Sequence, residues 1–255
     1  MGSYADAGGV KQWYDTAGDD GDALLLLHGG LVGNDTWGMQ MTFFAQHFRV
    51  FANERRAHGR TPDVDGPLTY EDMAADTIAF LEQVVGEPAH LVGWSDGGNV
   101  GLLIAIERPD LVRKLVTIGS NYHSEGLVGE TDLQPDDPNL IMMRSMYEAA
   151  SPDGPEHWPV MLGKVLEMWQ NFGIDRARIE RIEAPTLVMV GDDDATHLEH
   201  TIDLYRAIPK SALAVVPHAS HLVPLEQADH VNATILRFLQ NDPPATLWPI
   251  RRATS

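Results

Sequence analysis

The sequence predicts an α/β protein with a mostly parallel central sheet that helices cover on both faces. Apolar runs alternate with helical patterns along most of the 255 residues, which is typical of β–α–β units with right-handed crossovers. Some runs, such as residues 23–27, are apolar at every position, as expected of a strand buried on both sides. A chain of this length can form one domain with a sizeable core.

The strand predictions rest on short apolar runs that end in Gly, Asp or Pro, and the helix predictions on apolar residues at helical spacing. For the helix at 69–85, Thr69 and Asp72 resemble a capping box and Gly86 can end it. Pro109 ends the expected helix at 99–108. The expected strands are 10–17, 23–27, 48–52, 89–92, 115–119, 185–190 and 213–216. The expected helices are 39–44, 69–85, 99–108, 139–150, 157–172, 198–208 and 227–239.

The most specific motif of the chain is Gly-x-Ser-x-Gly, from Gly93 to Gly97, between an apolar strand and an apolar helix. A serine at such a sharp turn exposes its hydroxyl above the sheet, and strained backbone of this kind is tolerated mainly at functional sites. The glycines fit places where strand and helix approach too closely for a Cβ atom. The motif therefore indicates Ser95 as a nucleophile.

Ser95 needs a base, because a hydroxyl is a poor nucleophile near neutral pH. Two later apolar strands end in candidate partners. The first is followed by Asp192, Asp193 and Asp194, and the second by His218 and His221.

In these features the sequence resembles the α/β-hydrolase superfamily over nearly its whole length. There the acid and the base follow the nucleophile in this order. The family's Gly-Asp-x-Asp pattern implies that Asp194 is the acid. Its Gly-His pattern implies that His221 is the base, although Ser220 replaces the usual Gly. Asp192, Asp193 and His218 remain alternatives, and His218 follows its strand so directly that it has less loop to reach the serine.

Two further loops resemble the family. His28-Gly29-Gly30 is similar to the oxyanion loop, which implies that the backbone N–H groups of Gly30 and Asp96 hold an oxyanion. An ordinary glycine turn is the alternative. The stretch 53–63 resembles the family's Asp-x-Arg-Gly-His-Gly-x-Ser loop, with several departures, and its charged residues 54–56 are interpreted as bracing the loop.

Residues 121–182 interrupt the alternation of strands and helices, and two helices rich in Met and Trp are expected in them. An insertion here resembles the cap of many α/β-hydrolases, which implies a core of 1–120 and 183–255 and a cap of 121–182. The apolar side chains either pack the cap on the core or line a pocket. The candidate substrate-binding residues are Trp37, Trp94, Asp96, Met142, Met146, Trp158 and Trp169.

Composition excludes several classes of site and partner. The chain has no cysteine, so disulfides and thiolate zinc sites are excluded. A net charge of −19 disfavours nucleic acid and anionic membranes, and no apolar run reaches the roughly 18 residues of a membrane span. His197 and His200 resemble a metal pair only superficially, because no further ligand is evident. We expect no metal and no cofactor, a cytoplasmic location without a signal peptide, and a monomer or homodimer.

A serine at position 95 argues against dehalogenases and epoxide hydrolases of this fold, which use Asp. The resemblance implies a serine hydrolase with a Ser-His-Asp triad that cleaves a carboxylic ester or lactone through an acyl-enzyme. Alternatives are a C–C bond hydrolase, a perhydrolase or haloperoxidase, and a ligand sensor without turnover.

The turn around Ser95, from Gly93 to Gly98, is also similar to that of biphenyl-hydrolase-like (valacyclovir hydrolase) proteins. In that group an acidic residue near the nucleophile is linked to a substrate ammonium. This implies amino-acid ester hydrolysis as a further alternative, with Asp96 favouring neutral or cationic substrates.

Overall fold

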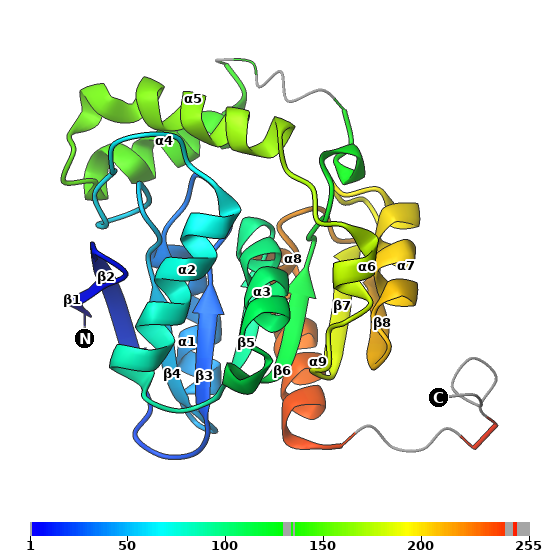
Figure 1. Cartoon of the computed structure of the whole chain (residues 1–255). Coiled ribbons are helices and arrows are strands. Elements are labelled where there is room, and N and C mark those ends of the chain that lie inside the picture. The colour runs from blue at the N-terminus through cyan, green and yellow to red at the C-terminus, as the bar shows by residue number, and fades with distance from the viewer. Residues whose placement is uncertain (1, 130–133, 135, 243–246, 249–255) are drawn as a thin grey trace.

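A sheet of eight strands in the order β1-β2-β4-β3-β5-β6-β7-β8 forms the centre of the part of the chain that the structure describes (Figure 1). The structure is a computed structural model, and it describes residues 2–129, 134, 136–242 and 247–248. The strands are β1 (Gly2–Ala7), β2 (Val10–Ala17), β3 (Ala23–Leu27), β4 (Arg49–Asn53), β5 (Ala89–Trp94), β6 (Val112–Ile118), β7 (Thr186–Gly191) and β8 (Ser211–Val216). From β4 to β8 all neighbours are parallel, which confirms the predicted class.

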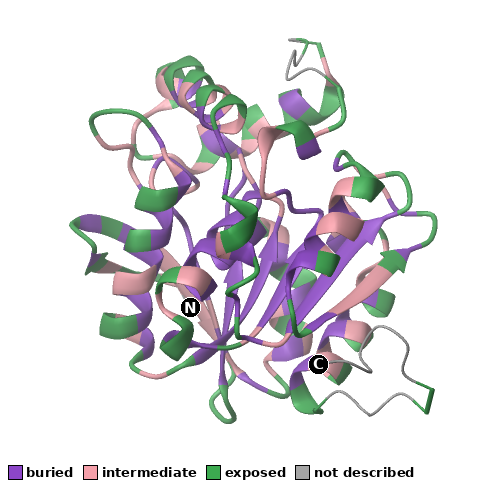
Figure 2. Cartoon of the chain, turned by 45° about the vertical axis from the view of Figure 1, so that its right-hand side comes forward, coloured by how far each residue is buried: buried purple, intermediate pink, exposed green. Residues whose placement is uncertain are grey.

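Helices cover both faces of this sheet, and its strands are the most buried part of the molecule (Figure 2). The helices are α1 (Gly38–Phe44), α2 (Tyr70–Phe80), α3 (Asp96–Glu107), α4 (Pro138–Ala150), α5 (Trp158–Gln170), α6 (Arg176–Ile179), α7 (Leu198–Ala207), α8 (Val223–Glu226) and α9 (Ala228–Gln240). Alternate residues of β3 belong to two different cores: Leu25 and Leu27 pack in the core that contains α2 and α3, whereas Leu24 and Leu26 pack in the core that contains α1 and α9. This explains why β3 is apolar at every position.

The N-terminal hairpin of β1 and β2 was not expected in full, because only its second strand was predicted. β1 pairs with β2 antiparallel, and Gly8 and Gly9 at the turn have φ of 64° and 80°. Two positive φ values in succession are typical of the tight turns that join antiparallel strands. The first strand lacks a run of apolar residues, since it lies at the edge of the sheet.

Helix α2 begins and ends as its sequence predicts. The Thr69 hydroxyl accepts a hydrogen bond from the backbone N–H of Asp72 at 3.0 Å. The helix continues as one π-helical stretch over Leu81–Val85 and ends at Gly86, whose φ of 75° is left-handed. A residue without a Cβ adopts this conformation at low cost.

The segment between β6 and β7 places α4 and α5 above the carboxyl ends of the central strands (Figure 1). It is joined to the loop after β4 through Asp63. The Asp63 carboxylate accepts hydrogen bonds from His157 at 2.8 Å and Lys164 at 2.7 Å, and its backbone N–H donates to Asp153 at 2.7 Å. These contacts hold the amino-terminal half of α5 against the core.

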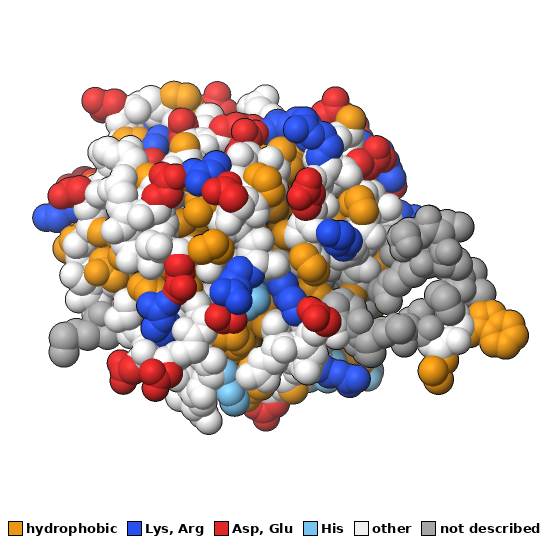
Figure 3. Space-filling view, turned by 60° about the horizontal axis from the view of Figure 1, so that its bottom comes forward, with side chains coloured by type: hydrophobic (Ala, Val, Ile, Leu, Met, Phe, Trp, Pro, Cys, Tyr) orange, Lys and Arg blue, Asp and Glu red, His pale blue; other side chains and the backbone are white. Residues whose placement is uncertain are grey.

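Acidic and basic side chains lie interspersed on the lower face of the molecule (Figure 3). The net charge of −19 therefore does not gather as a single acidic patch on that face. Within the described residues, the structure has no helix of the length and apolar character that crossing a bilayer requires.

Candidate active site

Ser95 occupies a sharp turn between β5 and α3. Its φ of 53° and ψ of −122° are strained for a residue with a side chain. The neighbouring glycines are required by close backbone contacts: a Cβ on Gly93 would lie 2.3 Å from the Gly97 carbonyl oxygen, and one on Gly97 would lie 2.0 Å from that of Leu27. The predicted turn is thus present, and it places the Ser95 hydroxyl at the carboxyl edge of the sheet.

Ser95, His221 and Asp194 form one hydrogen-bonded chain. His221 Nε2 lies 2.9 Å from Ser95 Oγ, and His221 Nδ1 lies 2.7 Å from Asp194 Oδ1. A carboxylate accepts but does not donate, so Nδ1 carries the proton and Nε2 is free to accept one from the serine. The indole of Trp94 donates to the His221 carbonyl at 2.8 Å and so fixes the histidine backbone.

The Asp194 carboxylate is held by the loop that follows β7. It accepts backbone N–H groups from Gly191 and Thr196, each at 3.1 Å. Its side chain is almost fully buried, whereas that of His221 is 28% exposed. The Asp194 carboxylate is therefore fixed inside the protein, while the His221 imidazole is partly exposed to solvent.

The alternative residues lie elsewhere. The Asp192 carboxylate accepts the backbone N–H of Ala219 at 3.1 Å, and Asp193 and His218 are exposed. His200 stacks on Tyr122 and accepts its backbone N–H at 3.1 Å. In the described part of the chain no group of three His, Asp or Glu side chains could hold a metal ion.

The loop after β3 passes directly over the serine. A Cβ on Gly29 would lie 3.5 Å from that of Ser95. Gly30 follows on this loop, and Asp96 opens α3, whose first backbone N–H groups have no acceptor within the helix. The two predicted oxyanion donors therefore belong to segments that meet at Ser95.

The Asp96 side chain is buried, with 3% of its surface exposed. Its carboxylate accepts the Tyr70 hydroxyl at 2.6 Å and the indole N–H of Trp169 at 3.0 Å from both oxygens. Burial raises the pKa of this carboxyl, although the two hydrogen bonds and the charge of Arg55 act in the opposite direction.

Arg55 has a role that sequence reasoning missed. It is fully buried, and its guanidinium donates to the carbonyls of His28 at 2.7 Å and Gly29 at 3.1 Å. Burial lowers its pKa to about 10, so the group stays charged at neutral pH. The resemblance of stretch 53–63 to a loop that borders the family's site was the available signal. The flanking charges brace the loop, with Glu54 bound to Arg60 and Arg56 to Asp76.

The other candidate substrate-binding residues lie in different parts of the structure. Trp37 and Trp94 are buried with their rings 6.4 Å apart, and Trp158 is buried against Tyr147. Met142 is 42% exposed and does not line the pocket described below. Trp169 contacts the side chain of Asp96, the residue after Ser95, and Met146 lines a pocket.

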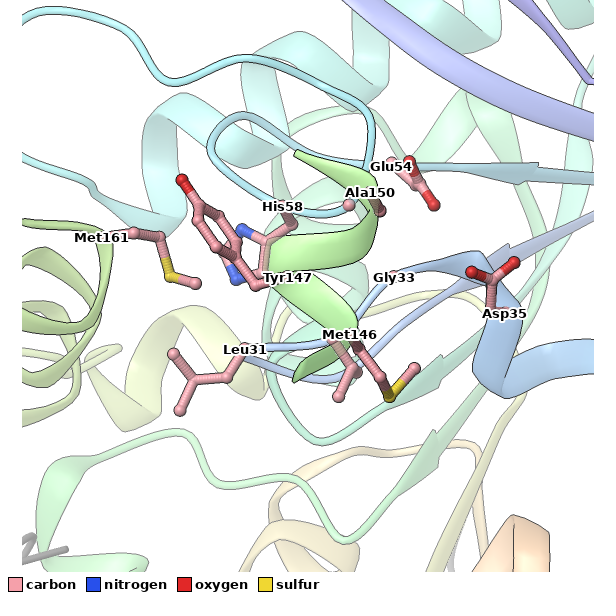
Figure 4. Close-up of a pocket in the computed structure, with 11 residues that line it drawn as sticks. Leu31, Gly33, Asp35, Glu54, His58, Met146, Tyr147, Ala150 and Met161 are labelled. Atoms are coloured by element: carbon pink, nitrogen blue, oxygen red, sulfur yellow. The ribbon is translucent and has the colours of Figure 1, made fainter. Parts of the chain in front are cut away.

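That pocket is an open hollow between α4, α5 and the loops after β3 and β4, with about 280 Å³ of empty space that includes open solvent (Figure 4). Leu31, Met146 and Met161 give it apolar walls. His58 Nε2 is buried there without a hydrogen-bond partner among the described residues. Burial lowers the pKa of His58 to about 4, and its Nδ1 faces the Arg56 carbonyl at 2.9 Å, so the neutral ring offers Nε2 as an acceptor.

Comparisons with known proteins agree with this architecture. Residues 24–234 match the model of the "Alpha/beta hydrolase family". Serine hydrolase BPHL of Mus musculus is 27% identical over 248 residues, covering 91% of this chain and 84% of that protein. A bifunctional esterase/perhydrolase of Acinetobacter calcoaceticus is 27% identical over 279 residues, covering 94% and 100%.

A solved meta-cleavage product hydrolase from Pseudomonas fluorescens IP01 matches with a TM-score of 0.82 at 21% identity. The match covers 93% of this chain and 97% of that one. A structural likeness at this identity shows the fold.

Proposed function

The chain belongs to the alpha/beta hydrolase family, and from that premise we propose that it cleaves a carboxylic ester or lactone through an acyl-enzyme on Ser95. The observation that carries the proposal is the hydrogen-bonded chain from Ser95 through His221 to Asp194. This arrangement suits acyl transfer, because each group is within reach of the proton that it must move or orient.

In the first half of the reaction, Ser95 Oγ attacks the substrate carbonyl while His221 Nε2 takes the hydroxyl proton. The Asp194 carboxylate keeps His221 in the required tautomer and stabilises the imidazolium. The backbone N–H groups of Gly30 and Asp96 stabilise the negative oxygen of the tetrahedral intermediate. Collapse of the intermediate breaks the ester C–O bond, and His221 returns the proton to the leaving alcohol.

In the second half, water attacks the acyl-enzyme. His221 takes a proton from this water and returns it to Ser95 Oγ, which releases a carboxylic acid and restores the enzyme. We propose that the described part of residues 121–182 roofs the site during this cycle, since Trp169 of α5 contacts Asp96 next to the nucleophile; residues 130–133 and 135 of this predicted cap lie outside the described residues.

A neutral acyl group suits the site better than an amino-acid ester. The Asp96 carboxylate is 3% exposed and already accepts hydrogen bonds from Tyr70 and Trp169. A substrate ammonium would have to displace one of these donors, and removing a buried hydrogen bond costs about 1–3 kcal/mol.

Replacement of the nucleophile tests the proposal. We expect Ser95→Ala to lower kcat for p-nitrophenyl butyrate about 10⁶-fold, as is typical for loss of a triad nucleophile. A fluorophosphonate probe should label the wild-type protein at Ser95, and a panel of acyl esters, amino-acid esters and lactones then ranks the substrate classes. A folded Ser95→Ala protein with wild-type turnover would refute the mechanism.

A further inference from the structure

One buried carboxylate connects three elements around the nucleophile. Asp96 lies in the first turn of α3, Tyr70 begins α2 and Trp169 lies in the last turn of α5. The hydroxyl and the indole N–H both donate to the Asp96 carboxylate, at 2.6 Å and 3.0 Å. The proposed mechanism uses only the backbone of Asp96, so it leaves this side chain without a role.

The same carboxylate also packs against the second proposed oxyanion donor. A Cβ on Gly30 would lie 2.4 Å from Asp96 Oδ2 and 2.9 Å from Cζ2 of Trp169. Gly30 therefore lies directly against the carboxylate and the indole. The Arg55 guanidinium donates to the carbonyls of His28 and Gly29, which precede Gly30 on this loop. The loop is therefore held by Arg55 on one side of Gly30 and by the Asp96 contact at Gly30 itself.

A buried carboxylate at this place would weaken the proposed oxyanion hole unless other groups fix its position. Its charge opposes the negative charge that develops on the substrate oxygen. An Asp side chain at a helix start also readily accepts backbone N–H groups of the first turn, which are the groups that the hole needs. The hydrogen bonds from Tyr70 and Trp169 satisfy the carboxylate and keep it from turning to these donors.

We propose that Trp169 and Tyr70 are positioning residues for the oxyanion hole, acting through the side chain of Asp96. This inference rests on the proposed function, since it concerns the same site. Trp169 lies in the segment 121–182, so the position of α5 and the geometry of the hole depend on each other.

Removing single donors tests the proposal. Trp169→Phe keeps an aromatic ring but removes the N–H, and Tyr70→Phe removes the hydroxyl. Loss of a whole oxyanion donor costs about 10²–10³ in kcat, so displacement of one should lower kcat for p-nitrophenyl butyrate about tenfold in either variant. KM should change by less than about threefold, because the loss falls on the transition state.

A matched control is available in Trp13, whose indole N–H also donates to a carboxylate, that of Asp15 at 3.1 Å, on β2. Trp13→Phe removes the same kind of hydrogen bond far along the sheet and should leave kcat and KM unchanged.

The decisive experiment places Trp169→Phe in an Asp96→Ala background. Without the carboxylate, the second change should lower kcat no further, because nothing remains to be held. An equal loss in both backgrounds, a loss confined to KM, or no loss in the wild-type background would overturn the proposal. If Asp96→Ala does not fold, the changes of kcat and KM in Trp169→Phe and Tyr70→Phe decide alone. Wild-type kcat in both variants, with Ser95→Ala inactive, would refute this inference and leave the proposed function standing.

Discussion

At the scale of single residues, the proposed acid is distinguished from its neighbour by its hydrogen bonds. Asp194 contacts the His221 ring, whereas Asp192 accepts only backbone N–H groups near Ala219. We expect Asp194→Asn to lower kcat for an activated ester about 10⁴-fold, because an amide can hold His221 in the wrong tautomer. Asp192→Asn should cost far less in the same assay. A larger loss in Asp192→Asn would mean that the acid is assigned to the wrong residue.

A second prediction at this scale concerns the lack of a side chain at Gly30. A Cβ there would overlap the Asp96 carboxylate and the Trp169 ring, so Gly30→Ala must displace the proposed oxyanion loop or the indole. We expect a fall in kcat of about 10²-fold or more, in the range for a lost oxyanion donor. Gly163→Ala on α5 is the control, since a Cβ there meets nothing within 4 Å and helix propensity favours alanine. Equal activity in the two variants would contradict the role of Gly30.

At the scale of elements, Asp63 attaches the amino-terminal half of α5 to the core. Asp63→Ala removes the carboxylate that accepts from His157 and Lys164, and leaves Lys164 with the Val64 carbonyl as its acceptor. We expect amide hydrogen exchange in residues 158–170 to quicken while that of the central strands stays unchanged, because local opening of α5 becomes easier. Glu148→Ala, which removes an ion pair to Arg144 within α4, should leave exchange in α5 unaltered. Unchanged exchange in Asp63→Ala would show that the Asp63 carboxylate is not needed to hold the helix.

At the scale of the whole molecule, buried histidines make stability depend on pH. Burial, with a smaller effect of the nearby Arg113, lowers the pKa of His90 from 6.5 to about 4, although Asp22 acts in the opposite direction. Between these two pH values, His90 is protonated in the unfolded chain but not in the folded protein. Stability is therefore fully present above about pH 6.5 and falls towards pH 4, by up to about 1.4 kcal/mol per pH unit for one histidine.

The variant His90→Leu isolates this contribution. The ring packs beside Phe48 at 5.8 Å between centroids, so an apolar side chain suits the site. Urea unfolding from pH 7 to pH 4.5 should show a flatter loss of stability in His90→Leu than in the wild-type protein. His58 and His200, whose pKa values burial also lowers to about 4, keep part of the slope in both proteins. Parallel curves would show that His90 does not titrate as its burial implies.

The sequence by itself determined the features that depend on near neighbours in the chain. The bounds of β2 and β3 match the predicted strands 10–17 and 23–27, and the turn at Ser95 follows from the steric demands of Gly93 and Gly97. The order of apolar strands with polar ends brought the residues after two later strands forward as partners of Ser95, and the resemblance to the α/β-hydrolase superfamily implied Asp194 and His221 among them. The structure has these three side chains in one hydrogen-bonded chain. Carboxyl ends of parallel strands share one edge of a sheet, so such residues meet whatever the packing of the helices.

Only the tertiary structure decided where the side chains beside that chain point. The sequence indicated Asp96 as a candidate substrate-binding residue, yet its carboxylate is buried and bonded to Trp169, a residue 73 positions away. The sequence indicated Arg55 only as one of the charged residues that brace its own loop. In the structure it donates to the carbonyls of His28 and Gly29, which lie 27 and 26 positions earlier. Such contacts depend on how α5 and the loops after β3 and β4 pack against one another. A local pattern carries no information on that packing, because it arises from the burial of apolar surface across the whole fold.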